Sequence, residues 1–278
     1  MKLTYLGTGA AEGMPATFCG CPVCLRSLRE GGKSLRMRSC ALLGDDVLID
    51  MGPDIHAQKL RFGLRLDRLK AVVYTHSHED HQDLYALKLR GTASCAVQPE
   101  GAVLDLYGNR RVRERFELAI SQGHRAQEER FRFHTVEVWQ TFTAGPYTFH
   151  AIRASHRPAD VEDCLIYAVS DGRSAILYAN DTGEPGPGTD EYLRQSGLRF
   201  SLVSMDCTRG LLPGNGHMGW AEVLRLRERL RKIGAAGPDT RFVLTHLSHA
   251  GGMTHAEWEA FAAPHGIQVA YDGLEIDC

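Results

Sequence analysis

The chain has 278 residues, of which 43% are hydrophobic and 24% are charged, and its formal net charge is −2. This length fits one large α/β domain or two small ones and allows a sizeable core without disulfides. The near-neutral charge argues against a generally basic nucleic-acid binder. No apolar run approaches the ~20 residues that a membrane span needs. Residues 1–6 begin directly as a predicted strand and lack the apolar core of a signal peptide. We therefore expect a cytoplasmic protein whose eight cysteines are thiols or metal ligands rather than disulfides.

Short β-rich apolar runs recur along the chain and predict strands. They cover residues 3–7, 47–49, 71–75, 103–107, 147–152, 164–169, 175–179, 202–205, 242–245 and 267–271. Apolar residues at three- and four-residue steps predict helices at 111–121 and 221–233. Thr254 and Glu257, at capping-box spacing, predict a further helix that runs toward Ala263. Residues 183–188, rich in glycine and proline, predict a surface loop.

The order of these elements predicts the fold class. Each half of the chain reads as a run of strands with helices after it. Two sheets, each covered on its outer face by helices, would satisfy this order. We expect an α/β fold in a single domain over residues 1–278.

One loop carries a dense set of metal-binding side chains. The predicted strand at 71–75 runs directly into His76, His78, Asp80 and His81. Side chains two positions apart in an extended segment project to the same side, so His76 and His78 face one point. Imidazole suits Zn, Fe and Mn, and carboxylate suits harder divalent ions. The loop therefore predicts a metal site rather than a solvated polar turn.

Two ions need more ligands than this loop provides, and three further candidates follow predicted strands. His156 follows the strand at 147–152, Asp181 the strand at 175–179, and His246 the strand at 242–245. Ligands of open α/β sheets lie beyond the carboxyl ends of the strands. Each residue alone could be a turn or capping residue, but their common position favours one shared site.

In this order the residues resemble the five-motif series of the metallo-β-lactamase superfamily. The resemblance implies an αββα sandwich with two divalent metal ions, Mn or Zn, at one edge. It implies that one ion is held by His76, His78 and His156, that the other is held by Asp80, His81 and His246, and that Asp181 bridges the two.

A second candidate metal site lies near the N-terminus. Cys19, Cys21 and Cys24 place three thiols within six residues. A structural zinc needs four tetrahedral ligands, and three cysteines with one histidine form a common set. His249, three residues beyond His246, is the expected fourth ligand. We expect one structural zinc that contributes folding free energy, and free or redox-active cysteines are the alternative.

The two sites together resemble the PhnP-type phosphodiesterases associated with the carbon–phosphorus lyase pathway. The matching segments are residues 6–15, 19–24, 48–50, 75–81, 180–182, 205–207, 244–249 and 271–276. The resemblance implies a structural zinc, a dinuclear centre that favours manganese, and cyclic phosphodiesters of ribose as substrates. The chain departs from that family around residues 91–140 and 251–258.

The expected nucleophile is a hydroxide that bridges the two ions, because a metal pair acidifies water and stabilises both oxygens of an in-line displacement. Asp80 would orient this hydroxide as well as bind metal. His217, in a glycine-rich loop before a predicted helix, is the expected general acid, since its near-neutral pKa suits proton transfer. PhnP-like proteins place a catalytic histidine at this position. The alternative for His217 is a capping or loop residue.

Four further residues complete the predicted site. Asp50 and Asp206 end predicted strands, and we expect them to accept the free N–H of metal-bound imidazoles. Arg157 and Arg209 are candidates for binding a phosphate, because a guanidinium matches it with two hydrogen bonds. Solvated surface positions are the alternative for both arginines.

The favoured function is a metal-dependent phosphodiesterase, with a small-molecule phosphodiester as the expected partner, no membrane and no nucleic acid. A homodimer is left open. A lactonase or thioesterase is the alternative on the same scaffold, because a fold does not fix the substrate. Processing of tRNA, as in ribonuclease Z relatives, would need a long basic arm that the sequence lacks. A redox or non-catalytic metal protein is the alternative of another class, although redox sites of this type replace the histidine found here as His78 by glutamate.

Overall fold

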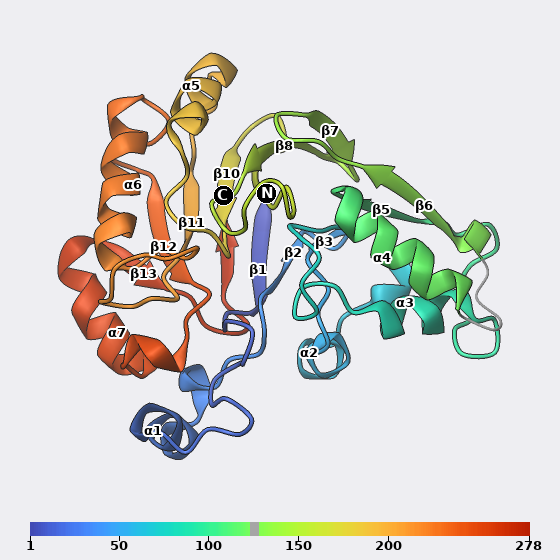
Figure 1. Ribbon diagram of the computed structural model, residues 1–278, viewed down its shortest axis with the longest axis horizontal. Helices are drawn as coiled ribbons and strands as arrows, with labels where there is room; N and C mark the ends of the chain where they lie inside the picture. The colour runs from blue at the N-terminus through green and yellow to red at the C-terminus, as the bar shows by residue number, and fades with distance from the viewer. Residues whose placement is uncertain (123–127) are drawn as a thin grey trace.

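The computed structural model describes residues 1–122 and 128–278, in which two seven-stranded sheets form a sandwich (Figure 1). The first sheet has the order β14-β1-β2-β3-β4-β5-β6, and the second has the order β13-β12-β11-β10-β9-β8-β7. The strands of the first sheet are β1 (Lys2–Gly7), β2 (Cys40–Leu43), β3 (Val47–Ile49), β4 (Ala71–Val73), β5 (Leu104–Gly108), β6 (Phe131–Thr135) and β14 (Glu275–Asp277). Those of the second are β7 (Thr141–Ala144), β8 (Tyr147–Arg153), β9 (Leu165–Ser170), β10 (Ala175–Ala179), β11 (Leu202–Asp206), β12 (Arg241–Thr245) and β13 (Ile267–Val269).

Each sheet is parallel in one part and antiparallel in the other. Strands β3 to β6 are parallel in the first sheet, and β10 to β13 are parallel in the second. The remaining pairs are antiparallel. Parallel strands are buried on both faces, which explains the uninterrupted apolar sequences of β3, β4 and β10. The carboxyl ends of neighbouring parallel strands meet at one edge, where ligand sites form.

Helices cover the outer face of each sheet, as Figure 1 shows with α5, α6 and α7 on one side and α2, α3 and α4 on the other. The helices are α1 (Pro22–Glu30), α2 (Ile55–Phe62), α3 (Leu84–Gly91), α4 (Arg110–Ser121), α5 (Pro187–Ser196), α6 (Trp220–Lys232) and α7 (His255–Ala262). Among the described residues, no helix is both long and apolar enough to cross a bilayer.

The core has three layers, which follow from the alternation of side chains along each strand. On β11, Leu202 lies in the cluster between the two sheets, whereas Val203 lies in the outer cluster with Leu226 of α6. A third cluster joins the outer face of the first sheet to its helices through residues such as Leu106 and Phe116. The predicted αββα sandwich is confirmed by these layers and the sheet orders.

Several element predictions need correction. Helices in the first half alternate with strands instead of following a run of them. The predicted loop at 183–188 is too long, because Pro187 begins α5, and proline is favoured in the first turn of a helix. The predicted strand at 267–271 ends at Val269. The helix predicted from Thr254 and Glu257 is present, and the Glu257 carboxylate accepts a 2.8 Å hydrogen bond from the Thr254 backbone N–H.

Candidate metal centre

The seven candidate ligands of the dinuclear site converge from segments far apart in the sequence. The loop after β4 carries four of them, and His156, Asp181 and His246 follow β8, β10 and β12. The first sheet and the second sheet therefore each contribute donors to one edge of the sandwich. The three single residues reach this edge because each stands just beyond the carboxyl end of its strand.

The first group of donors consists of three imidazoles and one carboxylate. The Nδ1 atom of His78 lies 2.8 Å from His76 Nε2 and 3.2 Å from His156 Nε2. Asp181 Oδ2 lies 3.3 Å from His76 Nε2. All four residues offer a donor atom within 4.8 Å of the others.

The second group shares Asp181 with the first. The Oδ2 atom of Asp181 lies 2.9 Å from His81 Nε2 and 3.6 Å from His246 Nε2. Asp80 Oδ2 lies 3.1 Å from His81 Nε2. Asp181 thus belongs to both groups of donors.

In four of the five candidate imidazole ligands, Nδ1 lies against an acceptor, which favours a proton on that nitrogen. Among the described residues these contacts are His81 Nδ1 to Asp50 Oδ2 at 2.8 Å, His76 Nδ1 to Thr75 Oγ at 2.9 Å, His246 Nδ1 to Thr208 Oγ at 2.7 Å and His156 Nδ1 to the Gly216 carbonyl at 3.1 Å. The two threonine hydroxyls donate to the Asp50 carboxylate and the His246 carbonyl, so they accept from the rings. Each of these four rings therefore turns the lone pair of Nε2 toward the donor groups.

These lone pairs test whether a cation fits. The Nε2 atoms of His81 and His246 are buried without a hydrogen-bond partner among the described residues. Buried polar atoms ordinarily find a partner, and these two nitrogens lie beside the Asp181 carboxylate, where a cation would be shared by imidazole and carboxylate donors. The mixture of imidazole and carboxylate suits divalent Zn or Mn. The donor set therefore fits divalent metal ions.

The backbone at the site adopts the left-handed conformation at three non-glycine residues. The φ angles are 62° at Asp50, 52° at Asp181 and 55° at His246. Such residues are uncommon outside glycine, and they persist where the surroundings fix them, often at functional sites. Each follows a strand by one or two residues, so a sharp turn aims its side chain back at the sheet edge.

Burial and neighbouring charges act against each other on the carboxylates of the site. Burial by itself would raise the pKa of Asp181, but His246 and His76 outweigh it and hold the pKa well below its usual range. The pKa of Asp80 is lowered in the same way by His81. Burial lowers the pKa of His76, and the neighbouring His81 adds to the effect. These shifts favour ionised carboxylates and, at His76, the neutral imidazole, which are the forms that bind metal. At His81 burial would lower the pKa, but Asp50 and Asp80 outweigh it and raise the pKa.

His217 lies beside the second donor group. Its Nδ1 atom is 3.1 Å from Asp206 Oδ2 and 3.1 Å from Asp181 Oδ1. Burial would lower the pKa of His217, but Asp206 and Asp181 outweigh it and raise the pKa above the usual value. His217, Asp206, Asp181 and His246 also offer donor atoms within 4.8 Å of one another, so the geometry permits a ligand role as well as the predicted acid role.

The two candidate phosphate-binding arginines differ in their surroundings. Arg157 Nη1 donates to Glu162 Oε2 at 3.3 Å, and its charge adds to the burial that lowers the pKa of His78. Arg209 donates from Nε to the Pro213 carbonyl at 3.2 Å and so supports the loop that carries His217. Arg157 is therefore the arginine that lies next to the donor groups.

The cysteine cluster and His249 also come together. His249 Nδ1 lies 3.3 Å from Cys19 Sγ and 3.4 Å from Cys21 Sγ, and Cys24 completes a group whose donor atoms all lie within 4.8 Å of one another. Cys21 stands at the start of α1, where the Cys24 backbone N–H and His249 lower its pKa to about 6. A thiolate is the form that binds zinc. On the far side of the ring, Glu12 Oε1 lies 3.7 Å from His249 Nε2.

Several residues at these sites carried little or no local signal in the sequence. Thr75 and Thr208 accept hydrogen bonds from candidate ligand rings. Glu12 lies beside His249. Glu162 accepts hydrogen bonds from Arg157 and Ser77. Each contact joins side chains through the fold. Only the threonines had a clue, since each lies within two residues of a predicted ligand or of Asp206.

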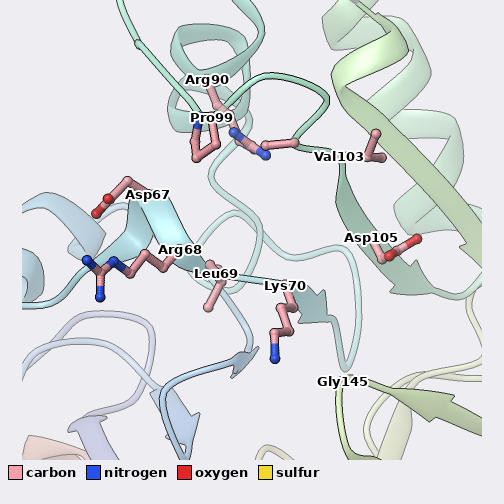
Figure 2. Close-up of a pocket in the computed structure, with 10 residues that line it drawn as sticks. Asp67, Arg68, Leu69, Lys70, Arg90, Pro99, Val103, Asp105 and Gly145 are labelled. Atoms are coloured by element: carbon pink, nitrogen blue, oxygen red, sulfur yellow. The ribbon is translucent and has the colours of Figure 1, made fainter.

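A pocket elsewhere on the molecule lies away from this chemistry. Figure 2 shows it where Lys70 and Val103 lead into β4 and β5, the opposite ends of these strands from the His76 loop. Its volume is about 380 Å³, and its lining contains none of the predicted site residues. Lys70 pairs with Asp46 at 3.0 Å, and Asp105 pairs with His134 at 2.7 Å. These charges are satisfied within the protein.

Known proteins resemble this chain over nearly its whole length. The crystal structure of a diphosphatase from the PhnP family is 26% identical, with a TM-score of 0.75, over 100% of this chain and 97% of that one. An octanoyltransferase of Porphyromonas gingivalis is 28% identical over 99% of this chain, which spans only 51% of the length of that protein. A ribonuclease Z of Gloeothece citriformis is 24% identical over 99% of this chain and 77% of its own length.

The family assignment follows from the extent of the match. Residues 45–270 match the β-lactamase superfamily domain. This range includes the seven candidate ligands of the dinuclear site and most of both sheets. The chain belongs to the β-lactamase superfamily and has the αββα sandwich of its metal-dependent hydrolases.

Proposed function

We propose that the protein is a metal-dependent phosphodiesterase that hydrolyses a small phosphodiester, with cyclic phosphodiesters of ribose as the first substrates to test. The observation that carries the proposal is the pair of four-donor groups that share Asp181, with His217 at their side. The likeness to a PhnP-family diphosphatase over the whole chain supports phosphate chemistry.

The proposed cofactors are two divalent ions, Mn or Zn. His76, His78, His156 and Asp181 would hold one, and Asp80, His81, His246 and Asp181 the other. When bound, such a pair supplies Lewis acidity and a nucleophile at neutral pH. The proposed structural zinc would be held by Cys19, Cys21, Cys24 and His249.

The residues around the donor groups have separate proposed tasks. Asp206 accepts from His217 Nδ1, which leaves Nε2 on the opposite side of the ring to donate a proton to the leaving alkoxide. Asp80, held against His81, would orient the attacking oxygen. Arg157 would bind a non-bridging phosphate oxygen, because a guanidinium offers two parallel N–H donors. Arg209, which supports the His217 loop, is the weaker candidate for this contact.

One observation favours a second candidate function. The relative named octanoyltransferase shares 28% identity with nearly the whole of this chain, and a metal pair activates water toward carbonyls as well as phosphates. A thioesterase or lactonase is therefore the competing function. The chain spans only half of that relative, so acyl transfer itself is not proposed.

A substrate panel separates these functions. The protein loaded with Mn²⁺ or Zn²⁺ is assayed on bis-p-nitrophenyl phosphate, a ribose cyclic phosphodiester, a dinucleoside diphosphate, a lactone and an acyl thioester. We expect turnover of the phosphodiesters. Turnover of carbonyl substrates alone, or oxygen consumption by an iron-loaded form without hydrolysis, would overturn the proposal.

Variants connect the activity to the site. His78→Ala should reduce turnover by about 100-fold or more, because it removes the donor that both His76 and His156 face. His56→Ala, on the exposed surface of α2, is the matched control and should leave turnover unchanged. Intact turnover in His78→Ala would show that the ligand assignment is wrong.

A further inference from the structure

A buried carboxylate outside both donor groups connects the parts of the site. Glu162 is 4% exposed, and its side chain has no exposed surface. An ionised carboxylate in such a place requires several hydrogen bonds or an ion pair. Glu162 accepts from the Ser77 backbone N–H at 2.8 Å, Ser77 Oγ at 2.9 Å, Asn109 Nδ2 at 3.0 Å and Arg157 Nη1 at 3.3 Å.

The contact with Ser77 acts on the loop that carries the donors. Ser77 lies between His76 and His78, and its side chain points to Glu162 while the two imidazoles meet at 2.8 Å in the first donor group. The Ser77 carbonyl accepts from Arg115 Nη1 of α4 at 2.6 Å. The backbone N–H, the hydroxyl and the carbonyl of Ser77 are therefore all bound. This fixes the peptide from which His76 and His78 diverge.

The same carboxylate joins the two sheets. Asn109 follows β5 of the first sheet, accepts from the Val112 backbone N–H at 3.0 Å at the start of α4, and donates to the Asp163 carbonyl at 2.9 Å. Glu162 lies between β8 and β9 of the second sheet, in the loop that begins after Arg153 and also carries His156. The first donor group combines His76 and His78 from one sheet with His156 from the other. Glu162 thus ties together the segments whose relative position sets that group.

Its fourth contact orients Arg157. The guanidinium is about one third exposed, and Arg157 directly follows the candidate ligand His156 in the chain. An arginine side chain is long and flexible, so a buried carboxylate at one Nη atom restricts the direction of the remaining N–H groups.

The geometry points to Glu162 as a positioning residue with two effects: it holds Ser77 so that His76 and His78 converge on a metal ion, and it aims Arg157 at the anionic group of the substrate. The first effect concerns metal affinity alone. The second rests on the proposed phosphodiesterase function.

Glu162→Gln separates positioning from simple structural support. The glutamine has the same size, and its one carbonyl oxygen can keep the contacts with the Ser77 N–H and Asn109. Its NH₂ group can donate to the Ser77 hydroxyl, but it then faces a donor, Arg157. Glu162→Asp keeps the charge on a shorter side chain and should recover part of both effects. Glu137→Gln is the matched control, because Glu137 is exposed on the same surface cavity that Glu162 lines.

The measurement is a calorimetric titration of the metal-depleted 278-residue chain with Mn²⁺, which thiolates such as those of the cysteine cluster disfavour. We expect Glu162→Gln to raise the Mn²⁺ dissociation constant by about tenfold, and Glu162→Asp to raise it less. With bis-p-nitrophenyl phosphate at saturating Mn²⁺, KM should rise in Glu162→Gln while kcat changes little. Arg157→Gln should raise KM without changing the Mn²⁺ dissociation constant.

The outcomes distinguish the inference from its alternatives. A lower melting temperature in Glu162→Gln with unchanged Mn²⁺ affinity and KM would show a purely structural role and refute the inference. The same change in Glu137→Gln would refute it as well. If Glu162→Gln does not fold, Glu162→Asp and Ser77→Ala carry the titration in its place. If the wild-type protein hydrolyses no phosphodiester, the proposed function fails, whereas the Mn²⁺ titration still decides the first effect.

Discussion

Replacing Asp50 by asparagine tests how a buried carboxylate sets the tautomer of His81. Asp50 is fully buried, and its two oxygens accept from His81 Nδ1 and from the Thr75 backbone N–H, each at 2.8 Å. With its proton on Nδ1, the ring keeps the lone pair of Nε2 for a metal ion. Asparagine has nearly the same size but only one acceptor oxygen. It cannot accept from both partners.

Either orientation of the new amide carries a cost. If its oxygen keeps Thr75, its NH₂ group faces His81 Nδ1 and moves the ring proton to Nε2, the atom that faces Asp80 and Asp181. If its oxygen keeps His81, the Thr75 N–H loses its acceptor in a buried position. An unsatisfied buried group costs about 1–3 kcal/mol. We therefore expect metal affinity to fall by about 10- to 100-fold.

The assay is a Mn²⁺ titration of Asp50→Asn beside Asp105→Asn. Asp105 is the matched control because it accepts from His134 Nε2 at 2.7 Å, and it lines the pocket of Figure 2 rather than the donor groups. Native Mn²⁺ affinity in a folded Asp50→Asn protein would refute the tautomer argument. An equal loss in Asp105→Asn would show that the effect is general instead of local.

Three further predictions address other parts of the molecule. His217→Ala should lower kcat by about 10²–10⁴ on substrates with an alkoxide leaving group. The loss should be much smaller on p-nitrophenyl esters, because their leaving group needs no proton. Equal losses on both substrate classes would contradict the acid role. Cys21→Ala should remove one zinc per chain and lower the melting temperature while metal binding at the Asp181 groups persists, as shown by elemental analysis and calorimetry; full zinc content would contradict the cysteine site. Burial lowers the pKa of His255 to about 4, and the positive charges of Arg36 and Lys33 add to this effect, whereas Glu259 acts against it. Between pH 6.5 and 4 the unfolded chain therefore binds a proton at His255 that the folded chain does not. As the pH falls through this window, the wild type should lose up to about 3 kcal/mol of unfolding free energy relative to His255→Asn. Parallel pH curves for the two proteins in urea unfolding would show that His255 does not titrate this way.

The parts of the fold that followed from sequence are those with strong local patterns. Buried parallel strands such as β4 and β10 are short apolar runs, and α4 and α6 repeat apolar residues at helical spacing. The three-residue strand β14 has no such pattern, because its position depends on pairing with β1 at the other end of the chain. Helix α5 was missed for the opposite reason, since Gly186 and Pro187 resemble a loop although they form its start.

The candidate site also has parts that the sequence predicts and parts that it does not. Residues 76–81 are consecutive, and the other candidate ligands follow predicted strands, so their convergence could be expected before the structure. The contacts of Thr208 with His246 and of Glu162 with Ser77 join residues 38 and 85 positions apart, and only the folded chain shows them. Sequence patterns predict which side chains have the right chemistry, but hydrogen-bond geometry decides which side chains orient them.

The placement of donors on both sheets connects metal binding to the assembly of the whole sandwich. His76, His78 and His81 come from the first sheet, whereas Asp181 and His246 come from the second. Strand β14, at the end of the chain, pairs with β1 in the first sheet, so the second half of the sequence is needed to complete the first sheet as well. Neither half can therefore form a complete donor group by itself. Because the facing lone pairs and carboxylates are costly without a cation, a metal ion bound across the sheets would stabilise the native sandwich against every partly folded form.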